Sequence, residues 1–214
     1  MIKGIIFDMD GVLFDSEPFY LQRRHDFFTS QGISINHLAP KDFIGGNLQH
    51  IWKRLFDGTN TIQREEELSA AYAAYKSANK LPYADLLFPE VLACLSTLKQ
   101  KGLQLAVASN SSREDVEHAL ESCYLKSYFS VVLGREDVPN GKPAPDIYQA
   151  AARALGYANE ELLVVEDSQK GIAAAKAAGL TVVAITDYRY DIDQSQADKQ
   201  IDHLGQLAPI LAQD

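Results

Sequence analysis

Two aspartates stand two residues apart where the first apolar run of the chain ends, in F-D-M-D-G (7–11). Side chains alternate in direction along a strand, so Asp8 and Asp10 would point the same way, and Gly11 would allow a sharp turn. Two unpaired carboxylates so placed repel each other and raise the pKa of one of them. A hard cation relieves that repulsion, and Mg²⁺ takes carboxylate oxygens as ligands. The spacing therefore predicts a magnesium site at the carboxyl end of a buried strand.

Other polar groups follow later apolar runs. Ser109 and Asn110 come after a second run, where a hydroxyl and free backbone N–H groups at a helix N-terminus form an anion site. Lys142 lies between a glycine and a proline, a setting that suits a fixed task such as neutralising a phosphoryl group. Glu166 and Asp167 end a fourth run. Taken singly, Ser109 and Asn110 could be helix caps, Lys142 a solvated surface charge, and the two acids ordinary residues at a helix N-terminus. Together, these residues predict an anion site beside a metal.

The elements that must position these residues are short β-branched runs separated by helical patterns. Near-continuous apolar strands are typical of a parallel sheet covered on both faces. The alternation predicts an α/β fold with a doubly wound parallel sheet. Strands are expected at 2–7, 103–108, 131–133, 162–165 and 181–185, and helices at about 89–100, 112–122, 145–155 and 168–178.

Helix ends and the C-terminal region carry further signals. Gly102 and Gly179 stand where helix C-caps are expected, and Ser168 is a candidate N-cap. The polar segment 187–202 is expected to form a solvated edge with a short last element.

Residues 16–84 interrupt the alternation with helical patterns alone, which is too long for a structureless loop. We therefore expect a core of residues 1–15 and 85–214 and an inserted α-helical cap of residues 16–84, covering the carboxyl end of the first strand. Gly45 and Gly46 interrupt the insertion. They predict either a substrate-facing turn or an ordinary turn between helices.

Composition narrows the possible partners. The chain has 20 Lys and Arg residues against 29 Asp and Glu residues, a net charge of −9, and no Lys/Arg-rich stripe. This argues against nucleic acid or an anionic membrane as the main partner. No apolar run approaches the roughly 20 residues that span a bilayer, and the start lacks signal-peptide anatomy. Cys94 and Cys123 are expected to be reduced packing residues, which fits a cytoplasmic protein.

Four motifs in order resemble the haloacid dehalogenase superfamily. They are D-x-D-G-V-x-x-D-S (8–16), S-N-S (109–111), G-K-P-x-P-D (141–146) and E-D-S-x-x-G (166–171). The resemblance is strongest to the branch with a helical cap, which holds β-phosphoglucomutase and many sugar-phosphate phosphatases. It implies a Rossmann-like core, an inserted cap and Mg²⁺-dependent phosphoryl transfer on a small phosphorylated metabolite.

The resemblance also implies roles for the acidic residues. Asp8 would be the nucleophile that becomes an aspartyl-phosphate, and Asp10 the general acid and base. Glu166 and Asp167 would hold Mg²⁺ together with Asp8 and the backbone carbonyl of Asp10. A carboxylate suits this task because it needs no deprotonation to attack at neutral pH.

The remaining implied roles concern phosphate binding. Ser109 would hold the transferring phosphoryl oxygens with Asn110 beside it, and Lys142 would neutralise both Asp8 and the phosphoryl group. The residues that determine substrate specificity are expected in the insertion. The protein is expected to be a monomer, because the cap already covers the site. The candidate specificity residues are Tyr20, Arg24, Gly45, Gly46 and Lys76.

Phosphatase and mutase are the two leading alternatives. The cap of a mutase must bind a second phosphate, which β-phosphoglucomutases achieve with an Arg after the glycine turn and a His after the first motif. Leu48 and Tyr20 stand at those places here, and Asn110 replaces the small residue associated with mutases. A phosphatase is therefore favoured, although Lys or Arg residues elsewhere in the insertion could substitute.

Two further alternatives are disfavoured. A phosphorylatable signalling receiver also uses acids, Mg²⁺, a hydroxyl and a Lys, but it has no cap. A non-catalytic relative would usually have lost one of Asp8, Asp10 or Lys142, and all three are present.

Overall fold

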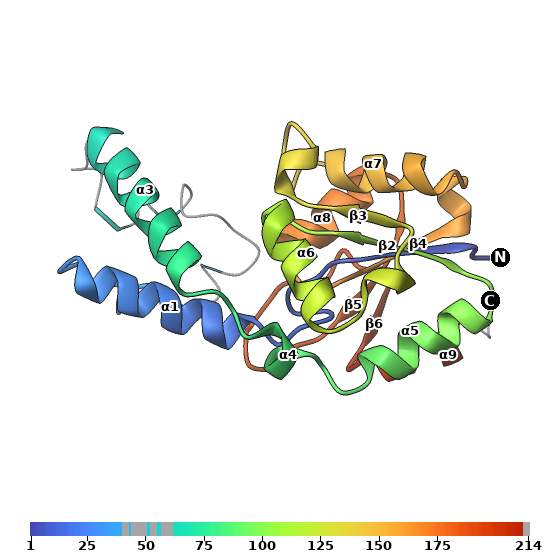
Figure 1. The fold of residues 1–214 in the computed structure, drawn as a ribbon. Coiled ribbons are helices and arrows are strands. Elements are labelled where there is room, and N and C mark those ends of the chain that lie inside the picture. The colour runs from blue at the N-terminus through green and yellow to red at the C-terminus, as the bar shows by residue number, and fades with distance from the viewer. Residues whose placement is uncertain (40–42, 44–50, 52–54, 57–61, 212–214) are drawn as a thin grey trace. The chain divides into compact units, whose positions relative to one another are not determined.

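The computed structural model describes residues 1–39, 43, 51, 55–56 and 62–211 (Figure 1). Its contacts divide the chain into two units, Met1–Asp15 with Tyr83–Asp214, and Ser16–Pro82. The second unit is two residues shorter than the predicted insertion of 16–84. The reason is that Tyr83 is 2% exposed and packs edge-to-face on Phe14 of the first unit, with ring centroids 5.1 Å apart.

The first unit contains a six-stranded parallel sheet in the order β3-β2-β1-β4-β5-β6. The order reverses between β1 and β4, and ligands of such sheets bind beyond the carboxyl ends of the strands at that point. The strands are β1 Gly4–Phe7, β2 Gln104–Ala108, β3 Val131–Leu133, β4 Leu162–Glu166, β5 Thr181–Ile185 and β6 Lys199–Ile201.

Helices lie on both faces of this sheet, with α7 and α8 on one and α5 and α9 on the other (Figure 1). β1 and β4 are buried along their whole length because both of their faces are covered. The predicted doubly wound α/β fold is therefore confirmed. The helices of this unit are α4 Tyr83–Leu86, α5 Val91–Gln100, α6 Arg113–Ser122, α7 Asp146–Leu155, α8 Gln169–Ala177 and α9 Leu207–Ile210, with short 3₁₀ turns at η3 Lys126–Tyr128, η4 Arg135–Asp137, η5 Asn159–Glu161 and η6 Leu204–Gln206.

The predicted helix ends agree with the structure. Ser168 Oγ accepts a hydrogen bond from Gly171 N at 3.0 Å and so caps α8. Gly102 and Gly179, just past α5 and α8, have φ of +79° and +76°, which glycine adopts without the usual penalty.

The short last element predicted within 187–202 is β6, which pairs in parallel with β5 at the edge of the sheet. Lys199 and Gln200 of this strand are exposed, as polar residues of edge strands commonly are. Lys176 Nζ and Val182 N both donate to Asp198, the residue before β6, at 2.8 Å. These bonds fix the entry to β6.

The second unit contains α1 Glu17–Ser30 and α3 Ile62–Ala78, which share an aromatic core. The ring of Phe27 lies 5.0 Å from that of Tyr72 and 5.5 Å from that of Tyr75, centroid to centroid. Gly45, Gly46 and Leu48 lie outside the described residues. Among the described residues, none of the helices combines the length and the apolar character that a membrane span requires.

Candidate active site

A buried cluster of charges lies where β1 and β4 end. Lys142 Nζ donates to Asp8 Oδ1 and to Glu166 Oε1, both at 2.6 Å. The three side chains are only 3%, 10% and 0% exposed, respectively. Asp8 follows β1 and donates its backbone N–H to Val165 O of β4 at 2.9 Å. Because buried charges are tolerated only when paired, this ammonium is what allows the two carboxylates to lie together.

The Glu166 carboxylate accepts five hydrogen bonds. Oε1 accepts from Lys142 Nζ and from the Tyr148 hydroxyl at 2.7 Å. Oε2 accepts from Asp167 N at 3.0 Å and from Ser168 N and Ser168 Oγ, both at 3.1 Å. Both oxygens are therefore engaged, and the side chain is held in one orientation.

Two glycines allow the carboxylates to come this close. A Cβ at Gly171 would overlap the Glu166 carboxylate, and a Cβ at Gly11 would overlap that of Asp167. Gly11 also has a φ of +77°, which permits the turn after Asp10 that the sequence predicted. The glycines of the first and fourth motifs thus make room for the acids beside them.

Asp8, Glu166 and Asp167 form a set that could hold a metal ion. Each is buried and offers one carboxylate oxygen, and these oxygens lie within 4.8 Å of one another. Oxygen donors grouped in this way suit a hard divalent cation. The structure thus brings three of the four predicted metal-binding residues into one buried set.

The fourth, Asp10, is linked to the segment after β2. Ser111 Oγ donates to Asp10 Oδ2 at 2.6 Å, while Asp10 also pairs with Phe14 in an isolated backbone bridge. The carboxylate is therefore oriented by a hydroxyl of the third residue of S-N-S. A proton-transfer group must be held in this way to act at a defined atom.

The other residues of that segment are fixed as well. Ser109 is 1% exposed, and its Oγ accepts from Ser111 N at 3.0 Å. Asn110 Oδ1 accepts from Lys142 N at 2.9 Å, while Asn110 Nδ2 donates to Lys142 O at 3.3 Å. The Asn110 amide therefore holds the backbone of Lys142. Its predicted contact with a phosphoryl group stays a prediction.

The electrostatics of the cluster follow from burial and pairing. The pKa of Asp8 is raised to about 8, mainly by burial; the charges of Glu166 and Asp10 add to the rise, and the Lys142 ammonium opposes it. Burial alone would lower the pKa of Lys142, but the Asp8 and Glu166 carboxylates raise it overall. Burial disfavours the ionised form of Glu166 and alone would raise its pKa, but Lys142 and the hydrogen bonds hold this pKa below the usual value. Of the two carboxylates paired with Lys142, Asp8 is thus the one whose ionised form is disfavoured.

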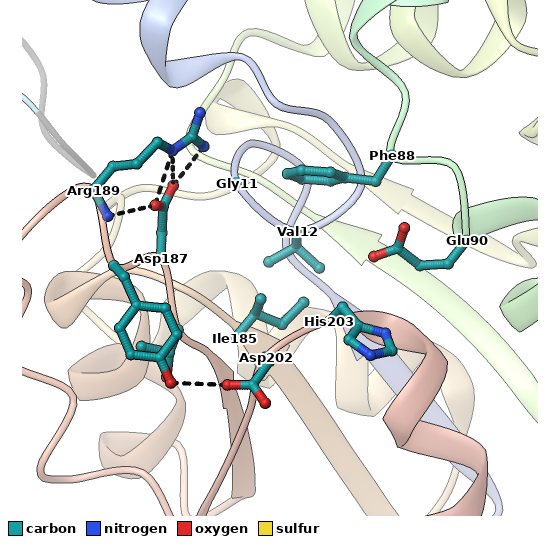
Figure 2. Close-up of a pocket in the computed structure, with 11 residues that line it drawn as sticks. Gly11, Val12, Phe88, Glu90, Ile185, Asp187, Arg189, Asp202 and His203 are labelled. Carbon is teal, nitrogen blue, oxygen red and sulfur yellow. Dashed lines mark hydrogen bonds and ion pairs between the residues drawn. The ribbon is translucent and has the colours of Figure 1, made fainter.

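Asp15, the last acid of the first motif, has a separate partner. Arg189 Nη2 and Nη1 donate to its two carboxylate oxygens at 2.6 and 3.1 Å. The same guanidinium contacts Asp187 (Figure 2), and Asp15 N donates to Leu86 O at 2.7 Å. Asp15 thus fixes the end of the loop that carries Asp8 and Asp10.

A cavity of about 420 Å³ adjoins this loop (Figure 2). Gly11, Val12, Phe88, Ile185 and Arg189 are among its lining residues. The described lining residues include no side chain of the buried charge cluster. The cavity therefore shares with the cluster only the loop after β1.

Sequence reasoning missed three residues of this region. Ser111 is the third residue of the S-N-S motif, and its hydroxyl is the signal that could have indicated a role. Tyr148 follows the G-K-P-x-P-D motif by two residues and had the pattern of an ordinary core aromatic. Arg189 pairs with an acid 174 positions away, and no local pattern could indicate that contact.

The sequence matches the family model described as haloacid dehalogenase-like hydrolase over residues 5–185. The chain belongs to this family. The predictions of the family and of a hydrolase are therefore confirmed.

Relatives of this hydrolase include phosphatases. The phosphoglycolate phosphatase of Escherichia coli K12 is 41% identical, over 98% of this chain and 92% of its own. An Arabidopsis thaliana chloroplast protein, SUPPRESSOR OF QUENCHING 1, is 32% identical over 86% of this chain, which spans 18% of that protein's length.

Two solved structures share the fold of the hydrolase over nearly the whole chain. CbbY from Rhodobacter sphaeroides, in complex with phosphate, is 25% identical with a TM-score of 0.78, covering 97% of this chain and 96% of its own. A Thermotoga maritima protein provisionally named a β-phosphoglucomutase is 26% identical with a TM-score of 0.74, covering 99% of each chain.

Proposed function

We propose that this hydrolase is a Mg²⁺-dependent phosphatase of a small phosphorylated metabolite that works through an aspartyl-phosphate on Asp8. The observation that carries the proposal is the pair of 2.6 Å contacts from Lys142 Nζ to Asp8 and Glu166 beyond the ends of β1 and β4. Phosphoryl transfer depends mostly on positioning and charge neutralisation, which such a cluster can supply.

The donor set fits a divalent cation. Asp8, Glu166 and Asp167 each offer a buried carboxylate oxygen within 4.8 Å of the others, and such oxygens are ligands that a hard divalent cation prefers. Asp8 and Asp167 would be the ligands, with the backbone carbonyl of Asp10, and Glu166 would join only by exchanging one of its five hydrogen bonds. When bound, Mg²⁺ would supply charge neutralisation for the phosphoryl oxygens and for Asp8.

The protein's own groups can carry the two steps. An Asp8 oxygen forms a bond to phosphorus while the bond from phosphorus to the leaving oxygen breaks, and Asp10 gives that oxygen a proton. Asp10 then takes a proton from the water that attacks phosphorus and releases Asp8. The Ser109 hydroxyl donates to the phosphoryl oxygens, and Lys142 balances their charge.

The raised pKa of Asp8 gives a prediction about stability. Without a bound cation, folded Asp8 keeps its proton up to about pH 8, whereas the ordinary pKa is 3.8. The unfolded chain therefore binds fewer protons between these values, and the free energy of unfolding should fall as pH rises. In EDTA, urea midpoints should decrease from pH 5.5 to pH 8 in the wild type.

Mg²⁺ should remove that decrease, because a cation beside Asp8 stabilises the ionised carboxylate. Asp8→Asn should also remove it, since an amide does not titrate. The same pH dependence in the wild type and in Asp8→Asn, with or without Mg²⁺, would contradict the assignment of this shift to Asp8.

The substrate class is proposed from the relatives. The 41% identity to a phosphoglycolate phosphatase makes 2-phosphoglycolate the first candidate, ahead of sugar phosphates. Phosphate release should be measured with Mg²⁺ on p-nitrophenyl phosphate, 2-phosphoglycolate and hexose and pentose phosphates. Release that requires Mg²⁺ and has the highest kcat/KM on one of the metabolites would support the proposal. Absence of release from every ester would refute it.

A mutase is the second candidate, favoured by the structural match to the Thermotoga maritima protein. The deciding assay supplies β-glucose 1-phosphate with a trace of glucose 1,6-bisphosphate. Glucose 6-phosphate as the product would establish the mutase, whereas free phosphate would favour the phosphatase.

The setting of the enzyme is also a proposal. Cys94 and Cys123 are both free and buried, which supports a reducing, cytoplasmic location. The acidic net charge of −9 supports a small metabolite rather than nucleic acid or a membrane as partner. We propose a monomer, which size-exclusion chromatography with light scattering would test.

A further inference from the structure

Tyr148 borders the buried charge cluster from the first turn of α7. Its side chain is fully buried, at 0% exposure. Its hydroxyl donates to Glu166 Oε1 at 2.7 Å, and Lys142 Nζ lies 4.7 Å from the centroid of its ring. Both the hydroxyl and the ring therefore act on members of the cluster.

The two donors to Glu166 Oε1 compete. Lys142 Nζ lies 2.6 Å from this oxygen and 2.6 Å from Asp8 Oδ1, so the ammonium is shared evenly between two carboxylates. The Tyr148 hydroxyl donates a hydrogen bond to the same Oε1. This bond offsets part of the negative charge on that oxygen and so weakens the electrostatic attraction between Glu166 and Lys142. The Lys142 ammonium also lies over the face of the Tyr148 ring, and the negative face of an aromatic ring attracts a cation.

We propose that Tyr148 is a positioning residue that sets how Lys142 divides its charge between Asp8 and Glu166. This rests on the proposed function, in which Lys142 balances Asp8 and the phosphoryl group. Without the hydroxyl, Lys142 would be the only side-chain donor among the described residues to Glu166 Oε1. The ammonium would then move toward Glu166 and away from the nucleophile.

Tyr148→Phe tests the hydroxyl alone, because it keeps the ring. We expect kcat to fall about tenfold, the scale of one hydrogen bond to a charged group, with KM changed less than about twofold. Tyr148→Leu removes the ring too and should lower kcat further. Tyr128→Phe is the matched control, because it removes a hydroxyl that pairs with Ser96 Oγ at 2.9 Å, and its kcat should equal that of the wild type.

A second readout does not depend on activity. In protein labelled with ¹⁵N at lysine Nζ, the Lys142 ammonium resonance, assigned by its loss in Lys142→Met, should shift in Tyr148→Phe and stay in place in Tyr128→Phe. An unchanged resonance together with unchanged kcat in Tyr148→Phe would overturn the proposal, even if the melting temperature fell. If the wild type hydrolyses no ester, the proposed function fails, but the resonance still decides the role of Tyr148.

Discussion

Asp8→Asn is expected to reduce phosphate release by at least about 10⁴-fold, the scale seen when a catalytic nucleophile is removed. The amide can still occupy the space beside Lys142, but it cannot form the bond to phosphorus. The fold should persist, because the buried ammonium keeps Glu166 as its partner at 2.6 Å. The measurement is kcat with Mg²⁺ on the best ester, together with the melting temperature.

Asp85→Asn is the control for this prediction. Asp85 lies exposed in α4 of the same unit, so the substitution makes the same change in net charge away from the cluster. Its kcat should match that of the wild type. Turnover by Asp8→Asn within about tenfold of the wild type would show that Asp8 is not the nucleophile, since such a group contributes far more.

Lys142→Met should have the second-largest effect, on both stability and activity. Methionine fills a similar volume but leaves the Asp8 and Glu166 carboxylates facing each other without compensation. Breaking a buried ion pair by removing one partner costs about 3–5 kcal/mol. Urea unfolding in EDTA measures this loss of stability.

Lys176→Met is the matched substitution on the surface. Lys176 pairs with Asp198 at 2.8 Å, but both side chains are more than a third exposed. Exposed pairs contribute about 0–1 kcal/mol, so this variant should unfold close to the wild type. Equal losses in the two variants would mean that the buried position of Lys142 has no special electrostatic role.

The sheet and the positions of the acids were predictable because each depends on a local pattern. Asp8 and Glu166 directly follow or end buried strands, and parallel strands bring their carboxyl ends to one edge. The order of the strands then makes these two residues neighbours, since β1 pairs with β4. The family motifs could be recognised from the sequence alone, without knowledge of any side-chain contact.

The contacts that orient these acids were not predictable, because they depend on packing between distant elements. The Tyr148 hydroxyl contacts Glu166 because of the way α7 packs on the sheet. No pattern in the sequence around Tyr148 indicates that its hydroxyl has a polar partner. The Asn110 amide holds the backbone of Lys142, a residue 32 positions away. The boundary at residue 82 likewise depends on Tyr83 packing against Phe14.

The nucleophile can be identified directly by finding the phosphoryl group on the enzyme. The wild type should be mixed with its best substrate and Mg²⁺, quenched in acid within one turnover and analysed by peptide mass spectrometry. We predict the added mass of one phosphoryl group on the peptide that contains Asp8, and its absence in Asp8→Asn. Turnover without this modification, or with the phosphoryl group on another residue, would contradict Asp8 as the nucleophile.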